Sequence, residues 1–502
     1  MNPGNLRAAV LGCTFDDFIF APQFSVIERR DPAAIDLSSR LSEHVTLKRP
    51  IVSANMDTVT RSAMAIVQAE EGGIGIIDRG FRSGDITAQV REVEIVKRTQ
   101  HGVIQDPYTI AAGDSLFEAA ATMEKSGVGT LVVVDGARKL RGLLTQRDIR
   151  FADGRDPRSG VKVADRMTPI DRLVLHVGPT SLDEAERIML ERKIKKLPLI
   201  DPSGVLVGLI TAKDIDKQKR MPFATRDEHG RLRVGAAIGA KGDFLERAAE
   251  LIRVGVDVIV IDIAHAHSVV MSRAIEQFRK QFGDAELIAG NVATGEGARF
   301  LAERGINGIK VGIGPGGGCT TRLNTNFGVP QVQALVDCAS AIQGMNIPMI
   351  ADGGLRRDGA LVEALLFGGD TVMLGNAFAG TIETPGETVH KSVVLPESQK
   401  AVKVAFKVFR GMASIGAIVD RLDVEDADTL DLETLGAEGL EVSVPARGSA
   451  RSIVQDMVKH LCSAISYGGA SNLAELKELF WKQPERYLIK LSEAGRRESY
   501  ER

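Results

Sequence analysis

The chain has 502 residues, which allows two to four domains, and its hydrophobic (44%) and charged (26%) fractions are ordinary for a globular protein. Lys and Arg number 63 against 66 Asp and Glu, a balance that gives no positive field for nucleic acid or an anionic membrane. The N-terminal residues lack the apolar core of a signal peptide, and no apolar run is long enough to span a bilayer. We therefore expect a cytoplasmic protein that binds neither nucleic acid nor membrane.

The cysteines do not suggest a disulfide framework. The four are Cys13, Cys319, Cys338 and Cys462, and they form no CxxC pair. Scattered cysteines of this kind are typical of free thiols in a reducing compartment. We expect Cys338 and Cys462 to be buried bystanders.

The first predicted strands are PIVSAN, from residue 50, and GIGIID, from residue 73. Both are nearly continuous apolar runs, as expected of parallel strands that are buried on both faces. Residues 1–104 are therefore predicted to begin an α/β domain.

An internal repeat follows within residues 105–219. GLLTQRDI (142–149) recurs as GLITAKDI (208–215), and each copy comes after an apolar stretch, an acid-capped helix and a buried-looking strand. Two copies are too few for a solenoid, so we expect a pseudo-symmetric pair that packs on itself.

This segment resembles a tandem CBS domain pair, a regulatory module that often binds adenine or guanine nucleotides. The resemblance implies an ATP- or GTP-type ligand whose ribose hydroxyls are held by Thr145 and Asp148 in one copy and by Thr211 and Asp214 in the other. The alternative is that Asp148 and Asp214 only cap the helices that follow them.

Six more strands are predicted after the repeat, and amphipathic helices separate them. The strands are VGAAIG, VDVIVIDIA, AELIAGNV, GIKVGIG, IPMIADGG and DTVMLGNAF. With the first two they make eight strand–helix units, which indicate an α/β fold, a (β/α)8 TIM barrel. Residues 105–219 are then an insertion after the second helix, and the barrel resumes over residues 220–502.

Polar residues stand at the carboxyl ends of these strands. Any one of them could simply cap a helix, but barrel enzymes build their sites at this rim, so the convergence favours a site. The residues are Asn55, Asp78, Asp262, Asn291, the loop 312–319, Asp352 and Asn376.

The loop VGIGPGGGCTTR (311–322) allows two interpretations. Its GxGxxG spacing suggests a dinucleotide phosphate loop, but Pro315 interrupts the pattern and no helical period begins before Val329. In the second interpretation, the glycines form a conformationally permissive arm that presents Cys319 as a nucleophile. Backbone amides and Arg322 would favour its thiolate, and Thr321 would relay a proton. We favour the second interpretation.

Over nearly its full length the chain resembles the IMP dehydrogenase and GMP reductase family. The resemblance includes the place of the CBS insertion, and it implies a TIM-barrel oxidoreductase of purine nucleotides that forms homotetramers, or octamers paired through the CBS modules. The matching stretches are TFDD, PIVSANMDTVT, GGIGII, VIDIAHAHS, AGNVAT, KVGIGPGGGCTTR, GVPQ, ADGG, VMLGNAFAG, FRGMAS and EGLEVSVPARGS.

Site roles follow from the same resemblance. Cys319 would attack C2 of the purine, and Thr321 would handle the proton. The substrate would be bound by Met56, Asn291, Arg322, Asp352, Gly354, Gly375, Asn376, Gly411, Met412 and Glu438. The cofactor would contact Asp262, Ala264, Asn291 and Gly312. The carbonyls of Gly314, Gly316 and Cys319 would hold K⁺. His265 and His267 are interpreted as structural or cofactor-adjacent, not as a metal site.

The two branches of the family share a thioimidate at the catalytic cysteine. The dehydrogenase forms it from IMP by hydride transfer to NAD⁺ and hydrolyses it with an Arg-Tyr pair on a flap. The reductase forms it by expelling ammonia from GMP and reduces it with NADPH. Here the flap, residues 413–437, contains Arg421 as its only arginine and no tyrosine; Glu425 and Asp426 stand where the pair would fall. This favours a GMP reductase that uses NADPH.

Other residues keep the alternatives open. Ile415 replaces a glutamate typical of short reductases, and CBS pairs are commoner in dehydrogenases, so IMP dehydrogenase with NAD is the alternative. Phe409, Gly317 and Asn376 depart from the family's phosphate-binding residues. A third hypothesis is a nucleotide-sensing CBS assembly with a weakly active barrel.

Overall fold

The computed structural model describes residues 3–82, 84–99, 103–104, 106–150, 160–178, 180–394, 401–421 and 438–500. The chain divides into two compact units. The barrel unit comprises Met1–Lys97, Phe223–Asp227 and Leu232–Arg502, and the insert unit comprises Arg98–Pro222 and Glu228–Arg231.

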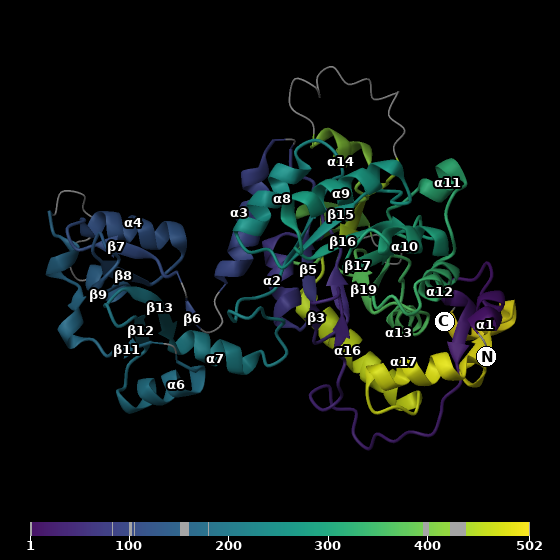
Figure 1. Cartoon of the computed structure of the whole chain (residues 1–502), viewed down its shortest axis with the longest axis horizontal. Coiled ribbons are helices and arrows are strands. Elements are labelled where there is room, and N and C mark those ends of the chain that lie inside the picture. The colour runs from purple at the N-terminus through teal and green to yellow at the C-terminus, as the bar shows by residue number, and fades with distance from the viewer. Residues whose placement is uncertain are drawn as a thin grey trace. The chain divides into compact units, whose positions relative to one another are not determined.

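The barrel unit is built on a closed sheet of parallel strands (Figure 1). In spatial order around the barrel these are β14 (Gly235–Ile238), β15 (Val258–Asp262), β16 (Leu287–Val292), β17 (Gly308–Val311), β18 (Met349–Asp352), β19 (Thr371–Leu374), β4 (Ile51–Ser53) and β5 (Ile74–Ile77). All eight predicted strands are present, and the predicted (β/α)8 TIM barrel is confirmed.

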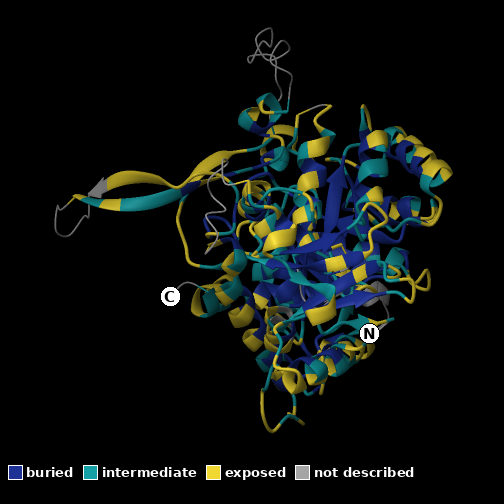
Figure 2. Cartoon of the chain, turned by 90° about the vertical axis from the view of Figure 1, so that its left-hand side faces the viewer, coloured by how far each residue is buried: buried dark blue, intermediate teal, exposed yellow. Residues whose placement is uncertain are grey.

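The apolar composition of the strands explains why they occupy the centre. Every residue of β14 and β19 is buried, and Figure 2 shows buried strands surrounded by helices with exposed outer faces. Side chains from β4, β14, β15, β16, β18 and β19 pack together inside the barrel, among them Val52, Ala237, Val260, Ile288, Ile350 and Met373. The interior is therefore a packed core, and a ligand site must lie at a rim.

Helices follow the strands in the alternating order that a parallel sheet requires. They are α2 (Ser62–Glu70), α3 (Ile86–Arg98), α8 (Phe244–Arg253), α9 (Val269–Phe282), α10 (Gly295–Ala302), α12 (Gln331–Ala341), α13 (Gly359–Leu366) and, much later in the chain, α16 (Ala450–Tyr467). The insert unit begins at Arg98, the last residue of α3.

Three smaller sheets belong to the barrel unit, the shortest being the pair of β2 (Ser39–Arg40) and β3 (Thr46–Leu47). β1 (Phe18–Phe20) pairs with β23 (Leu488–Lys490), which brings the first and last parts of the chain together. β20 (Val389–Val394), β21 (Ala401–Arg410) and β22 (Glu441–Pro445) form an antiparallel sheet, and Figure 2 shows its ribbon extending from the body of the unit. The inner end of β21 delivers Phe409 and residues 410–412 to the barrel rim.

The insert unit contains two four-stranded sheets, as its internal repeat predicts. One has the order β10-β9-β8-β7, and the other has the order β11-β12-β13-β6. The strands are β6 (Val103–Ile104), β7 (Thr109–Ala111), β8 (Thr130–Val134), β9 (Leu140–Thr145), β10 (Thr168–Pro169), β11 (His176–Val177), β12 (Lys196–Ile200) and β13 (Leu206–Thr211). The helices are α4 (Leu116–Ser126), α5 (Gln146–Arg150), α6 (Leu182–Glu191) and α7 (Ala212–Arg220).

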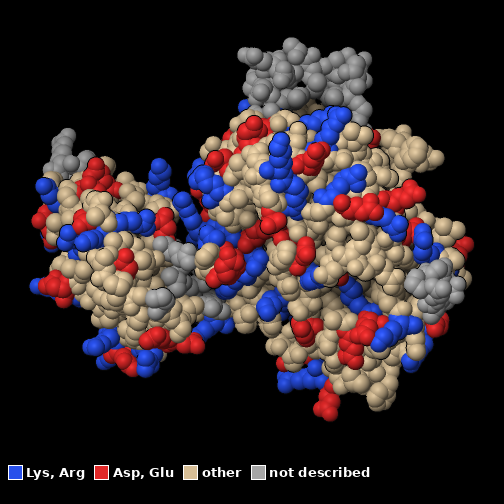
Figure 3. All heavy atoms as spheres, in the orientation of Figure 1, with Lys and Arg blue, Asp and Glu red and all other residues tan. Residues whose placement is uncertain are grey.

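Two observations on the described residues concern membranes and nucleic acids. None of the described helices is long and apolar enough to cross a bilayer. On the face drawn in Figure 3, basic and acidic side chains are intermingled. The face shown therefore has no single-sign stripe of the kind that tracks a phosphate backbone.

Candidate active site

One cavity of about 640 Å³ opens at the carboxyl ends of the barrel strands. Its volume lies in the range typical of sites for small ligands and cofactors. Most residues predicted for substrate, cofactor and catalysis line it: Met56, Asp262, Ala264, Asn291, Gly312, Gly314, Gly316, Cys319, Thr321, Asp352, Gly354, Gly375, Asn376, Gly411, Met412 and Glu438. The structure therefore brings residues from seven different loops and strand ends to one place.

The glycine-rich loop turns sharply after β17 and ends at Cys319. Gly312 has a φ of 150°, and a Cβ there would lie 2.2 Å from the carbonyl oxygen of Asp352, so only glycine fits. The loop continues into α11 (Thr321–Thr325), a helix too short for a dinucleotide phosphate site. This geometry favours the interpretation of the loop as a support for Cys319.

Cys319 begins a chain of hydrogen bonds. Its thiol is half-buried and donates to Thr321 Oγ1 at 3.2 Å, and the Thr321 hydroxyl donates to Glu438 Oε2 at 2.6 Å. The thiol proton thus has a path through one hydroxyl to a carboxylate. The sequence analysis placed Glu438 against the substrate base; its bond to Thr321, across 117 residues of sequence, was not foreseen.

Backbone hydrogen bonds join the segment that carries Cys319 to the segment that carries Glu438. Thr320 N–H donates to the Glu438 carbonyl at 3.0 Å, and Leu440 N–H donates to the Gly318 carbonyl at 2.9 Å. Glu438 N–H in turn donates to Ala413 O at 3.1 Å. The cysteine loop, the start of the flap at 413 and its end at 438 are therefore joined as one local structure.

A buried lysine organises the opposite wall of the cavity. Lys310 Nζ lies 2.8 Å from Asp262 Oδ1 and 2.6 Å from Asp352 Oδ2. Burial alone would raise the pKa of Asp262, but the charges of Lys310 and Arg79 outweigh it and hold the pKa below its ordinary value. The Asp262 carboxylate is thus held as an anion that can accept hydrogen bonds from ligand hydroxyls or amides.

Asn291 links this wall to the loop. Its Nδ2 donates to the Gly312 carbonyl at 2.6 Å and to Asp352 Oδ2 at 2.9 Å. Its Oδ1 is buried and has no hydrogen-bond partner among the described residues. A buried acceptor left unpaired in a cavity is available to a ligand amide or hydroxyl.

Arg322 differs from the other predicted site residues because it is not among the residues that line the cavity. Its guanidinium donates to the carbonyls of Ile313 and Val329, and its chain packs against Gly314 and Gly328. The side chain therefore braces the cysteine loop, a role that the loop sequence alone did not indicate.

Four cationic residues of the cavity were missed by the sequence analysis: Arg79, Lys310, Arg356 and Arg421. Lys310 did carry a signal, because a lysine inside the apolar strand GIKVG must find acidic partners. Arg79 and Arg421 had no comparable signal, since their directions depend on loop conformation.

The start of the flap is anchored beside β4. Arg410 Nη2 lies 2.7 Å from Asp57 Oδ2 and 2.6 Å from Asp420 Oδ2, and Asp57 N–H donates to Met412 Sδ at 3.3 Å. These contacts hold Met412 at the cavity. Glu425 and Asp426, which the sequence analysis aligned with the Arg-Tyr pair, lie outside the described residues.

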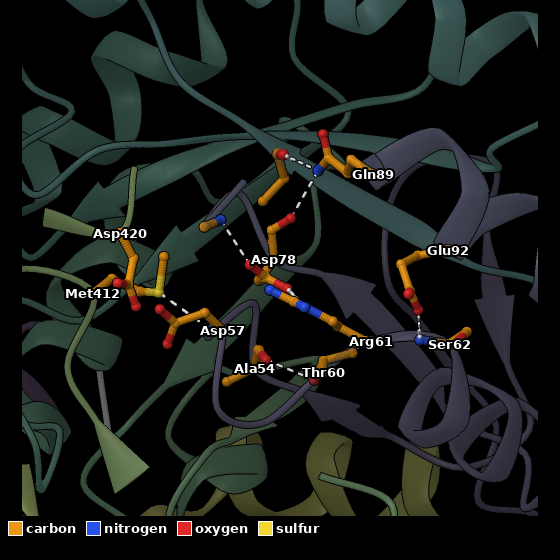
Figure 4. A network of polar contacts seen from close by, with 12 residues as sticks. Ala54, Asp57, Thr60, Arg61, Ser62, Asp78, Gln89, Glu92, Met412 and Asp420 are labelled. Atoms are coloured by element: carbon orange, nitrogen blue, oxygen red, sulfur yellow. Dashed lines mark hydrogen bonds and ion pairs between the residues drawn. The ribbon is translucent and has the colours of Figure 1, made fainter. Parts of the chain in front are cut away.

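Asp78, at the end of β5, is buried beneath the rim (Figure 4). Arg61 Nε lies 3.3 Å from Asp78 Oδ2, and Gly80 N–H donates to Oδ1 at 2.6 Å. Burial raises the pKa of Asp78 to about 6, and the charge of Arg61 only partly offsets it. The carboxyl therefore retains its proton in the folded state at pH values at which the unfolded chain has lost it.

This shift predicts a pH dependence of stability. Between about pH 4 and pH 6 the folded state binds more protons at Asp78 than the unfolded state, so the free energy of unfolding falls as the pH rises, by about 2–3 kcal/mol. Asp78→Asn should reduce the measured decline by this amount, as followed by urea unfolding at each pH, and leave the part due to Glu363 and Asp257, whose pKa values burial also raises. Asp85→Asn removes an exposed carboxylate and should leave the decline at full size; an undiminished decline in Asp78→Asn would contradict the assignment.

The predicted cation site remains a prediction. The loop offers carbonyl oxygens of the kind that K⁺ prefers, although the Gly316 carbonyl also accepts the Cys319 N–H at 3.0 Å. The rings of His265 and His267 are 6.3 Å apart, and His267 packs on Phe300. Among the described residues, no three His, Cys, Asp or Glu side chains converge as a metal site.

In the insert unit, the Asp148 carboxylate accepts both the N–H and the hydroxyl of Thr145 at 2.7 Å. This is the geometry of a helix cap, and it does not decide whether a nucleotide also binds there. Thr211 occupies the equivalent place at the end of β13, whereas the side chain of Asp214 lies outside the described residues.

The fold and the cysteine site together define a barrel oxidoreductase, and comparison identifies its family. Residues 12–501 match the family model described as the IMP dehydrogenase / GMP reductase domain. The chain belongs to this family.

Two kinds of relative are similar to it. Inosine-5'-monophosphate dehydrogenases from Aquifex aeolicus and Nitrosopumilus maritimus are 43% and 42% identical, over 97% of this chain and 95% and 97% of theirs. A solved GMP reductase from Trypanosoma brucei, in complex with guanosine 5'-monophosphate, has a TM-score of 0.85 and 36% identity over 97% of both chains. The chain is thus an NAD(P)-dependent purine nucleotide oxidoreductase of this family.

Proposed function

We propose that this protein is an IMP dehydrogenase, which converts IMP, NAD⁺ and water into XMP, NADH and a proton. The observation that carries the proposal is the 40–43% identity, over 97% of this chain, to relatives named as dehydrogenases. The hydrogen-bonded series from Cys319 through Thr321 to Glu438 supports it, because it supplies a nucleophile and a proton acceptor, the two groups that covalent hydrolysis requires.

In the first step the Cys319 thiol passes its proton through Thr321 to the Glu438 carboxylate, and the sulfur adds to C2 of the purine. NAD⁺, when bound, would supply the acceptor for the hydride of C2, and Glu438 releases its proton to solvent as the net proton of the reaction. Water then attacks C2 of the thioimidate that remains on Cys319, and one of its protons passes through Thr321 to the Glu438 carboxylate. The sulfur–carbon bond breaks, XMP departs, and the Cys319 sulfur takes that proton back from Glu438 through Thr321.

This proposal differs from the reductase that the flap sequence favours. The relatives that share 40–43% identity over 97% of this chain are named as dehydrogenases. Glu438 also provides a proton acceptor outside the segment in which Arg-Tyr is missing. Glu438 can therefore act as the base for the attacking water although the Arg-Tyr pair is missing.

GMP reductase, with NADPH as reductant, is the second candidate. The flap sequence from 413 to 437 contains one arginine and no tyrosine, and the Trypanosoma brucei GMP reductase is similar over the full length. In this reaction Glu438 and Thr321 would deliver a proton to the departing ammonia, so the same three side chains would serve.

The discriminating experiment follows absorbance of the reduced cofactor. Reduction of NAD⁺ with IMP supports the dehydrogenase. If NADPH is oxidised with GMP and NAD⁺ is not reduced with IMP, the protein is instead a reductase. Silence in both reactions would favour the third hypothesis, a nucleotide-sensing assembly. Repeating the active assay with K⁺ replaced by Li⁺ tests the predicted cation, and sedimentation with and without ATP or GTP tests the predicted tetramer, octamer and CBS ligand.

A further inference from the structure

Two arginine side chains, those of Arg79 and Arg421, line the part of the cavity in which Asp262 lies. Arg79 follows β5, Arg421 follows α14 (Ile415–Val419), and both line the cavity. Arg421 Nη2 donates to the Met412 carbonyl at 2.9 Å, but its Nη1 is buried without a hydrogen-bond partner among the described residues. Arg79 Nε lies 3.7 Å from Asp262 Oδ2, too far for a hydrogen bond, and is likewise unpartnered in the part of the chain described.

The acids nearby are already engaged by other cations. Asp57 is bound by Arg410 at 2.7 Å, and Asp262 is bound by Lys310 at 2.8 Å. Burial lowers the pKa of Arg421, and the charge of Arg79 lowers it further. Asp262 is thus shared between Lys310 and Arg79, and the two guanidinium groups repel each other in a partly desolvated cavity with N–H donors left unpaired, an arrangement that an anion would relieve.

We propose that Arg79 and Arg421 form a subsite for a phosphate group, and that its occupant is the diphosphate of the dinucleotide cofactor. The assignment of the occupant rests on the proposed function. Guanidinium groups present paired N–H donors that match phosphate oxygens, and donors left unpaired by the protein are free to make those bonds.

The substrate's own phosphate is expected elsewhere in the cavity. Gly354 and Gly375 are predicted to hold it, and their nearest neighbours are Pro315 and Met56, not the two arginines. A second anion must therefore be accommodated beside Asp262, and a nicotinamide dinucleotide brings one into the same cavity as the purine.

The test uses the full-length protein, saturated with IMP so that the substrate's phosphate site is filled, and titrates inorganic pyrophosphate by calorimetry. Arg79→Gln and Arg421→Gln should each weaken pyrophosphate binding about tenfold, the effect of losing one charge-assisted contact. Arg82→Gln is the matched control: it removes the same charge from the segment that carries Arg79, and Arg82 does not line the cavity. It should leave the affinity unchanged.

Equal affinity in all proteins, or an equal loss in Arg82→Gln, would overturn the subsite. In steady-state kinetics the two variants should raise KM for the dinucleotide about tenfold and change KM for the purine nucleotide little. Weaker pyrophosphate binding with an unchanged dinucleotide KM would overturn the cofactor as occupant and leave free phosphate as the ligand. If the protein catalyses neither nucleotide reaction, the pyrophosphate titration still tests whether the two arginines bind an anion, independently of the proposed function. If Arg421→Gln does not fold, Arg421→Lys replaces it in the test. Lysine keeps the positive charge but lacks the paired N–H donors of the guanidinium, so pyrophosphate binding should weaken about threefold.

Discussion

Cys319→Ala is expected to abolish turnover, with kcat reduced at least ~10⁴-fold, because no other group can form the covalent bond to C2. Substrate binding should survive, since the thiol is only one of many cavity contacts. The measurement is steady-state absorbance with the active nucleotide and cofactor pair, together with calorimetric binding of IMP. A modest loss of kcat would exclude Cys319 as the nucleophile.

The control for this experiment is Cys338→Ala. Cys338 is fully buried, donates to the Thr294 carbonyl at 3.4 Å, and has a thiol pKa raised by burial. Its loss should lower stability by about 1 kcal/mol and leave kcat unchanged. Alkylation by iodoacetamide, mapped by mass spectrometry, should modify Cys319 in the native protein and spare Cys338, because only the former is accessible.

Glu438→Gln is expected to reduce kcat by about 10²–10³-fold, because the amide keeps the hydrogen bond from Thr321 but cannot take a proton. The KM for the purine nucleotide should change little if this carboxylate acts mainly on the proton. The pH profile of kcat should also change shape, which a purely structural role would not produce. Steady-state kinetics across pH measure all three effects.

Glu441→Gln is the matched control for that variant. Glu441 is an exposed carboxylate three residues further along, and it does not line the cavity. It should retain the activity of the unchanged protein. If Glu438→Gln also retains full kcat, the proton acceptor lies elsewhere, and Arg421 becomes the residue to test.

Much of the fold could be predicted because the barrel strands carry a local signal. Continuous apolar runs such as those of β15 and β19 indicate burial on both faces, and the repeated segment marks its own boundaries. The rim residues could be predicted as a group, because parallel strands end at one edge. Asp262 and Asp352 illustrate this: each is the last residue of its strand, and each reaches the cavity.

Pairings between distant segments could not be predicted in the same way. One partner of Lys310 is on the adjacent strand β18 and the other is on β15, two strands away, and the bond between Thr321 and Glu438 depends on how the flap's end meets the cysteine loop. Arg322 and Arg421 show the same limit, since one turns away from the cavity and the other toward it. Side-chain direction in irregular segments depends on tertiary contacts that leave no periodic trace in sequence.

The contact between Glu438 N–H and the Ala413 carbonyl has a consequence for tolerance to insertion. Because these two residues bracket the flap sequence and are joined by backbone hydrogen bonds to each other and to the cysteine loop, the position of Cys319 does not depend on the number of residues between them. Doubling the length of a flexible loop costs only about 0.6 kcal/mol of closure entropy, so an insertion after Arg421 should leave the contacts among Cys319, Thr321 and Glu438 intact.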